Sequence, residues 1–187
     1  MNLNEYQQLA GRTLLDTPDQ MPTGLEYLLM WNGLGLAGEA GEVADLFRQQ
    51  TPISIALLTK ELGDLLWYTA AIGSKLGITM QLALDTSRND VPIIFLDGCT
   101  PPDLVLHLVA AAGSVSDSLK KQICHRHGLN VTVLAQQLGT VIRCVNQLCI
   151  RCQIDIVDVM QSNIAKLAAR YPEGYSSAAS KDWQATR

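Results

Sequence analysis

The sequence predicts an all-α protein in which residues 1–187 form a single domain, a helical bundle. Hydrophobic residues make up 48% of the chain and aromatic residues only 5%, which favours helices packed through aliphatic side chains over an aromatic-rich sheet. Apolar residues recur at steps of three and four along several stretches, the period of an amphipathic helix. Clusters of proline and glycine separate these stretches, and a chain of this length can bury a proper core.

Three helices are predicted in the first half of the chain. The first covers residues 1–14 and ends before a loop, residues 16–24, that holds two prolines and a glycine. A second helix covers residues 25–50, with a core stripe at Leu36, Ala40, Val43 and Phe47. The third covers residues 55–76, and its core stripe recurs at Leu58, Leu62, Leu65, Thr69, Ile72 and Leu76.

A linker divides the chain at residues 86–103, where three prolines interrupt the helical pattern. It separates a first unit, residues 25–85, from a second unit, residues 104–175. Within the second unit the periodicity predicts three more helices, over residues 104–123, 131–150 and 155–172.

The two units resemble each other at a nearly constant offset. Ala37-Gly38 matches Ala112-Gly113 at 75 positions, and Leu62-Gly63 matches Leu138-Gly139 at 76. The acidic residues of the first unit change in the second: Glu39 becomes Ser114, Glu42 becomes Asp117, Glu61 becomes Gln137 and Asp64 becomes Thr140. We therefore expect internally duplicated helical hairpins, a pseudo-dimer within one chain, although two unrelated amphipathic hairpins would share part of this pattern by chance.

Charge and hydropathy exclude several classes of protein. The net charge is -4 and no cluster of Lys or Arg forms a basic stripe, which argues against nucleic-acid binding. No apolar run approaches the roughly eighteen residues of a membrane span, and no signal-like segment follows Met1, so we expect a cytoplasmic protein without a membrane partner. Five cysteines are an odd number, and reduced, buried thiols are favoured over a zinc site at Cys149 and Cys152.

Two pairs of carboxylates carry the chemical signal. Glu39 and Glu42 are spaced i, i+3 and share one helix face, and Glu61 and Asp64 repeat this spacing on the next helix. In an antiparallel hairpin the four acids can converge, and their mutual repulsion is costly unless a cation is bound. Mg²⁺ prefers oxygen ligands and binds phosphates through its remaining positions, so the pattern indicates metal-assisted phosphate chemistry.

A solvated acidic face is the alternative explanation for these acids. Three glycines accompany them, Gly38, Gly41 and Gly63, and each costs about 1 kcal/mol relative to alanine within a helix. Close approach of a second helix or of a ligand would explain this choice. Lys60, beside the second acidic pair, is expected to be solvated rather than to contact phosphate.

The segment "GLAGEAGEVADL", followed by "KELGDLLWYTAAIGSKLGI", resembles the ExxE, spacer, ExxD signature of the MazG-like all-α nucleoside triphosphate pyrophosphohydrolases, a family related to dimeric dUTPases and phosphoribosyl-ATP pyrophosphatase. "LNEYQQLAGRT" resembles the opening helix of that family. "SNIAKLAARYPEGY" resembles its closing N-x-x-K-L-x-x-R-Y-P segment. These segments occur in the order expected for the family and imply a helical bundle of the MazG-like type.

The resemblance implies roles for the matching residues. The Mg²⁺ ligands would be Glu39, Glu42, Glu61 and Asp64, with Mn²⁺ as a possible substitute. Glu42 and Glu61 would be catalytic, Glu42 by accepting the proton of the attacking water. The triphosphate would be bound by Asn163, Lys166 and Arg170. The reaction is hydrolysis of a nucleoside triphosphate to monophosphate and pyrophosphate, as in nucleotide-pool house-cleaning; the alternative is a non-catalytic nucleotide-sensing or interaction module.

The chain departs from the family pattern by about 75 residues inserted between its acidic hairpin and its N-x-x-K helix. In the first unit, Ser87 and Asp90 stand where Asn163 and Lys166 stand in the second. The first unit thus keeps the metal-binding acids and the second keeps the phosphate-binding residues. We expect one composite site per chain, with a homodimer of pseudo-dimers as a possible assembly.

Overall fold

A computed structural model describes residues 7, 21–49, 52–87 and 98–173, and every regular element in these residues is an α-helix. The helices are α2 (Gly24–Arg48), α3 (Ile55–Leu76), α4 (Met80–Thr86), α6 (Pro101–Cys124), α7 (Val131–Arg151) and α8 (Ile156–Arg170). The predicted all-α class is confirmed. The predicted helix over residues 1–14 lies outside the described residues, except for residue 7, which is helical. The periodicity did not predict α4, because seven residues are too few for a helical period to repeat twice.

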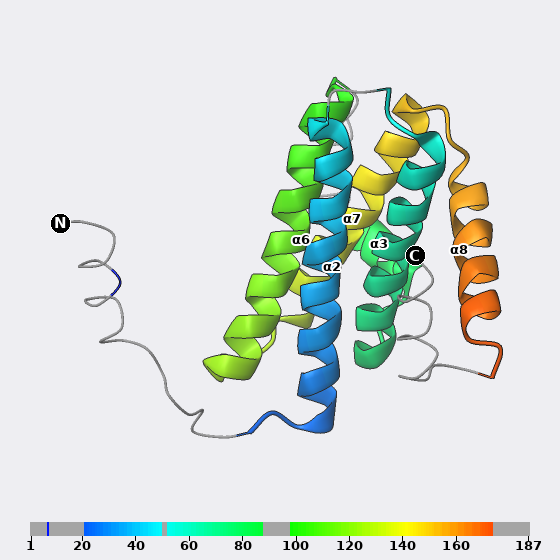
Figure 1. The fold of residues 1–187 in the computed structure, drawn as a ribbon. Coiled ribbons are helices and arrows are strands. Elements are labelled where there is room, and N and C mark those ends of the chain that lie inside the picture. Colours follow the sequence, from blue (N-terminus) through cyan, green and yellow to red (C-terminus); the bar gives the residue numbers. More distant parts are fainter. Residues whose placement is uncertain (1–6, 8–20, 50–51, 88–97, 174–187) are drawn as a thin grey trace.

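The helices form two antiparallel hairpins that lie side by side (Figure 1). The first hairpin consists of α2 and α3, the second of α6 and α7, and α2 packs along α6 at their junction. The remaining helices cross over: α8 packs on α3 of the first hairpin, whereas α4 packs on α7 of the second. Each hairpin therefore receives its third helix from the other half of the chain.

Local signals fix the helix boundaries. Thr23 and Thr100 begin α2 and α6 with capping boxes, in which the side chains of Glu26 and Asp103 accept a hydrogen bond from the backbone N–H of the capping threonine. Gly77 ends α3 in the left-handed conformation at φ 70°, which glycine adopts without strain. The predicted linker boundary at residue 103 is wrong by three residues, because proline is tolerated in the first turn of α6.

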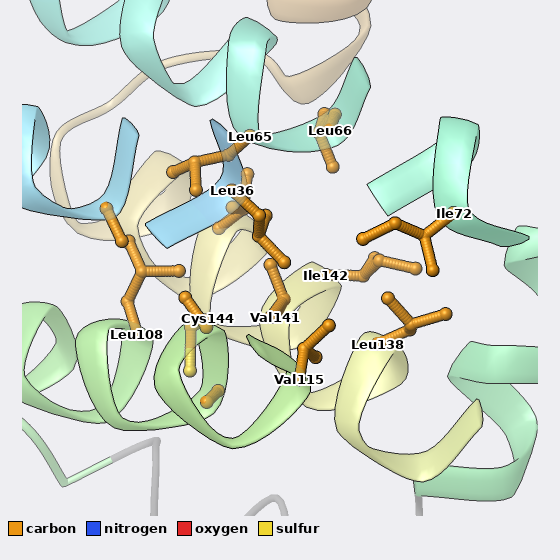
Figure 2. Packing of buried hydrophobic residues seen from close by; sticks show 14 of the residues in the cluster. Leu36, Leu65, Leu66, Ile72, Leu108, Val115, Leu138, Val141, Ile142 and Cys144 are labelled. Atoms are coloured by element: carbon orange, nitrogen blue, oxygen red, sulfur yellow. The ribbon is translucent and has the colours of Figure 1, made fainter. Parts of the chain in front are cut away.

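The core is formed by the predicted apolar stripes of α2 and α3 together with the facing residues of α6 and α7 (Figure 2). Leu36, Ala40 and Val43 are buried, and Phe47 packs half-buried against them. Cys144 and Cys149 are buried in this core, as predicted, whereas the prediction is wrong for Cys124, which is exposed at the end of α6; none of the five cysteines forms a disulfide. Burial raises the pKa of the Cys144 thiol to about 12, so this side chain behaves as a small hydrophobic group.

None of the described helices is both long enough and apolar enough to cross a membrane.

Candidate metal centre

Three carboxylates from two helices meet on the first hairpin. Glu39 comes from α2, and Glu61 and Asp64 come from successive turns of α3. One oxygen of each lies within 4.8 Å of the others, and no other such group of metal-ligating side chains occurs among the described residues. The i, i+3 spacing on α3 and the packing of α2 against α3 produce this convergence.

Helix α8 completes the centre from the far end of the chain. The amide nitrogen Nδ2 of Asn163 donates a hydrogen bond of 2.8 Å to Oδ1 of Asp64, and the Lys166 ammonium pairs with the same oxygen. Asn163 is buried and Lys166 is mostly shielded from solvent. The residues expected to bind metal and the residues expected to bind phosphate therefore meet at Asp64.

Gly63 allows this approach of α8 to α3. A Cβ atom at position 63 would lie 2.9 Å from the Cβ of Asn163, closer than real Cβ contacts. Gly38 and Gly41 differ, because a Cβ on either would meet no heavy atom of the structure within 4 Å, counting only its described part. Close helix packing thus accounts for Gly63 but not for the glycines beside Glu39.

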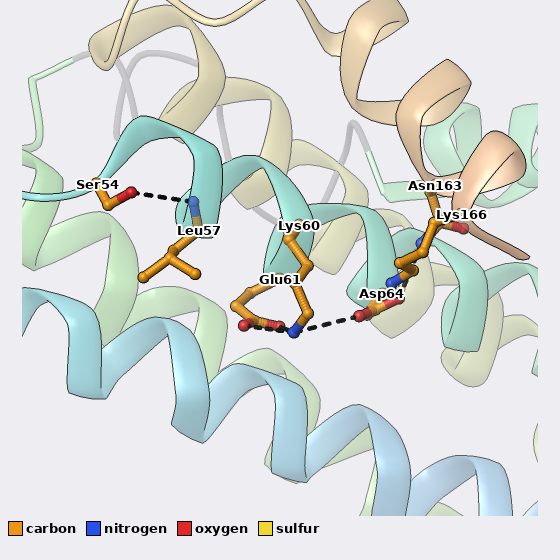
Figure 3. A network of polar contacts seen from close by, with 7 residues as sticks. All are labelled: Ser54, Leu57, Lys60, Glu61, Asp64, Asn163 and Lys166. Atoms are coloured by element: carbon orange, nitrogen blue, oxygen red, sulfur yellow. Dashed lines mark hydrogen bonds and ion pairs between the residues drawn. The ribbon is translucent and has the colours of Figure 1, made fainter. Parts of the chain in front are cut away.

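Lys60 is part of the centre, and the expectation of a solvated side chain is wrong. Its ammonium lies 2.7 and 2.8 Å from the two oxygens of Glu61 and 4.0 Å from Oδ2 of Asp64, and its side chain is only 24% exposed (Figure 3). Burial of the neighbouring acid explains this position, because the Glu61 side chain is 8% exposed and requires a charged partner. Lys60 and Glu61 are adjacent in the sequence, but adjacency alone does not indicate that the lysine side chain turns toward the glutamate.

Glu39 has the strongest electrostatic perturbation in the centre. Burial, followed by repulsion from Asp64, Glu42 and Glu61, raises the pKa of its carboxyl group to about 8. Its Oε2 atom is buried without a hydrogen-bond partner in the described part of the chain. An orphaned carboxylate oxygen among other hard oxygen donors fits a divalent cation such as Mg²⁺ or Mn²⁺.

Two predicted residues lie outside the contacts at Asp64. Glu42 is exposed on the next turn of α2, close enough to raise the pKa of Glu39 but not part of the three-carboxylate group. The guanidinium of Arg170 lies 5.0 Å from the ring centre of Tyr171. Burial and the nearby Glu39 raise the pKa of Tyr68, and the positive charge of Arg170 opposes this shift.

Tyr68 lies beside this centre; from the sequence it is a candidate for stacking on a base, with core packing as the favoured role. Its ring lies against Gly35, where a Cβ would come within 2.3 Å of it, one turn before Glu39 on α2. The ring therefore forms a half-buried wall beside the carboxylates. A glycine one turn before the ExxE pair was the available signal.

A cavity of about 250 Å³ opens beside the carboxylates, between α3 and α8. It is lined by Ala56, Thr59 and Lys60 of α3 and by Ser162, Asn163 and Lys166 of α8. Two ammonium groups, two hydroxyls and an amide make this lining suited to an anion.

The matching positions of the second hairpin form a different structure. Ser118 donates a hydrogen bond of 2.9 Å to Oε1 of Gln137, the residue that aligns with Glu61 at the offset of 76 positions. Asp117, which aligns with Glu42, is partly exposed and pairs with Lys120 and Lys121, whose hydrogen bonds lower its pKa to about 2. Comparison of the chain with models of protein families, with characterised proteins and with solved structures finds no match, so the side chains themselves are the basis for assigning a function.

Proposed function

We propose that this protein is a Mg²⁺-dependent nucleotide pyrophosphohydrolase of the MazG-like type, which cleaves (deoxy)nucleoside triphosphates to monophosphate and pyrophosphate. One observation carries the proposal: Asp64 belongs to a three-carboxylate group and also accepts contacts from Asn163 and Lys166 of a distant helix. A solvated acidic face does not explain buried acids with an unpartnered oxygen. Metal ligands beside cationic donors are what phosphoanhydride hydrolysis requires.

Each side chain has a task in this reaction. Glu39, Glu61 and Asp64 would hold Mg²⁺, which when bound neutralises phosphate charge and lowers the pKa of a coordinated water. Lys166 and Asn163 would bind phosphate oxygens and stabilise charge on the leaving pyrophosphate. Glu42, exposed at the edge of the group, can accept the proton of the attacking water.

We also propose that the two hairpins arose by duplication. Support comes from local features that recur 76 positions apart: the helix N-caps Ser54 and Asn130, the left-handed residues Gly77 and Gln153, and the N-caps Thr79 and Asp155. These features do not depend on hydrophobic periodicity, so two unrelated amphipathic hairpins would not be expected to share them.

The crossed packing of the third helices gives further support. Gly63 of α3 faces Asn163 of α8, and Gly139 of α7 faces Ser87 at the C-cap of α4, so the two contacts join matching positions. On the α4 side, the carbonyl of Ser87 accepts a hydrogen bond of 2.8 Å from Nη1 of Arg143. We therefore favour one composite site per chain, built from the acids of the first unit and α8 of the second.

Pyrophosphate release from a panel of nucleoside and deoxynucleoside triphosphates, with and without Mg²⁺, tests the activity. The wild type and Asp117→Asn should release pyrophosphate only when Mg²⁺ is present. Glu61→Gln should release none with or without Mg²⁺. Asp117→Asn is the matched control, because it neutralises a partly exposed acid of the second hairpin. Nucleotide binding without turnover in all three proteins would contradict the enzyme and support the sensing module.

A further inference from the structure

Two lysines flank Asp64, one at each carboxylate oxygen. Lys166 pairs with Oδ1, and Lys60 lies 4.0 Å from Oδ2 while it contacts both oxygens of Glu61. Glu61 and Asp64 would each offer a carboxylate oxygen to a divalent cation at the three-carboxylate group. The ammonium of Lys60 and a metal ion therefore compete for the same ligands.

The direction of the Lys60 side chain makes this competition specific. Neighbouring residues on a helix do not face each other, so the lysine stem bends around α3 to bring its ammonium to Glu61. A lysine stem has four flexible carbons, and the same side chain also lines the cavity between α3 and α8. Lys60 thus borders both the carboxylates and the cavity.

We propose that Lys60 is a displaceable counter-ion, which a divalent metal replaces at Glu61 and Asp64 and which then binds phosphate groups in the α3–α8 cavity. The metal competition stands without any assumption about turnover. The identity of the anion as the pyrophosphate portion of a nucleotide rests on the proposed function.

The cavity fits phosphate groups better than a complete nucleotide. Its volume of about 250 Å³ is below the range of roughly 300–1,000 Å³ for pockets that enclose a whole ligand. Thr59 and Ser162 add hydroxyls to the ammonium groups of Lys60 and Lys166. A pyrophosphate held there would be adjacent to the metal ligands.

The first test measures Mn²⁺ affinity without nucleotide, by calorimetry, for the wild type, Lys60→Gln, Lys60→Arg and Lys75→Gln. Removing the competing charge in Lys60→Gln should tighten Mn²⁺ binding by about tenfold, while Lys60→Arg should remain weak. Lys75→Gln is the matched control, because it removes an exposed lysine from the same helix about 22 Å away along its axis. It should bind Mn²⁺ as the wild type does.

The second test measures the affinity for inorganic pyrophosphate at saturating Mn²⁺. Lys60→Gln should bind pyrophosphate about tenfold more weakly than Lys75→Gln, because it lacks one of two cationic donors. If Lys60 were merely structural, its replacement would not tighten the binding of Mn²⁺ while weakening the binding of pyrophosphate. Thermal melts of each variant check that the fold is retained.

Either of two results would overturn the inference: equal Mn²⁺ affinities for Lys60→Gln and Lys75→Gln, or equal pyrophosphate affinities for this pair. Failure of the proposed function is a separate result, since it requires that the wild type release no pyrophosphate from any triphosphate. Tighter Mn²⁺ binding by Lys60→Gln would still support the metal competition in that case.

Discussion

Gly63 of α3 lies directly against Asn163 of α8, so that a Cβ on the glycine would be 2.9 Å from the Cβ of Asn163. This contact brings a residue from the end of the chain beside Asp64, the neighbour of Gly63 in sequence. Without it, the acids proposed to bind metal and the residues proposed to bind phosphate would lie on separate surfaces. The stability and the chemistry of the protein are therefore linked at one helix crossing.

Gly63→Ala should destabilise the protein by about 1–3 kcal/mol, because α8 must shift to admit the new methyl group. Chemical denaturation measures the change. Gly38→Ala is the matched control: its methyl would meet no described atom within 4 Å, so the higher helix propensity of alanine should stabilise by up to about 1 kcal/mol. Equal effects of the two substitutions would argue against the close crossing.

Gly139→Ala should destabilise the protein more than Gly63→Ala does. A Cβ at position 139 would lie 2.0 Å from the backbone carbonyl oxygen of Ala83, whereas a Cβ at position 63 would meet side-chain atoms of Asn163, and backbone yields less than a side chain. The same denaturation experiment ranks the two variants. A smaller loss for Gly139→Ala would contradict the packing of α4 on α7.

The stability contribution of Glu39 should fall as the pH rises. Its carboxyl has a pKa of about 8 in the folded protein against an ordinary value of 4.5, so between these values the folded state retains a proton that the unfolded state releases. The contribution is complete below pH 4.5 and is lost as the pH rises through about 8. Urea unfolding in the presence of a metal chelator measures the free energy of unfolding at each pH, and Glu39→Gln should lack this pH-dependent contribution. Identical pH profiles for the variant and the wild type would contradict the prediction.

Metal affinity should rise over the same pH range. A cation that binds Glu39 must displace its proton below a pH of about 8, so binding releases protons and tightens as the pH increases. Calorimetry with Mn²⁺ in buffers of different ionisation enthalpy measures the number released. An affinity independent of pH would mean that Glu39 is not a ligand.

Glu42→Gln should slow turnover by roughly 10²- to 10⁴-fold if Glu42 accepts the proton of the attacking water. Asp45→Asn is the control on the same helix, since Asp45 forms a partly exposed ion pair with Arg48 away from the three-carboxylate group. It should retain the wild-type rate in the pyrophosphate assay. Equal rates for Glu42→Gln and Asp45→Asn would remove Glu42 from the mechanism.

One composite site per chain predicts a nucleotide stoichiometry of one. Calorimetric titration with a non-hydrolysable triphosphate and a divalent metal measures it, and Asp64→Asn should abolish the binding. Two equivalent nucleotides per chain would contradict the composite site and would require the second hairpin to bind substrate with Gln137 and Thr140 in place of acids.

The sequence by itself determined the five longer described helices and the pairing of Glu61 with Asp64. Helix α3 spans the predicted residues 55–76, because its apolar period, its serine N-cap and its C-terminal glycine are all local signals. The i, i+3 spacing of Glu61 and Asp64 likewise requires only helical geometry.

Only the tertiary structure decided how these pieces combine. In the tertiary structure the Lys60 ammonium contacts Glu61, and Glu42 lies at the edge of the three-carboxylate group. Gly63, but not Gly38, packs closely against a neighbouring helix. The unpredicted α4 also packs against α7. Each of these outcomes depends on which surfaces meet across distant parts of the chain, and a local period carries no information about that.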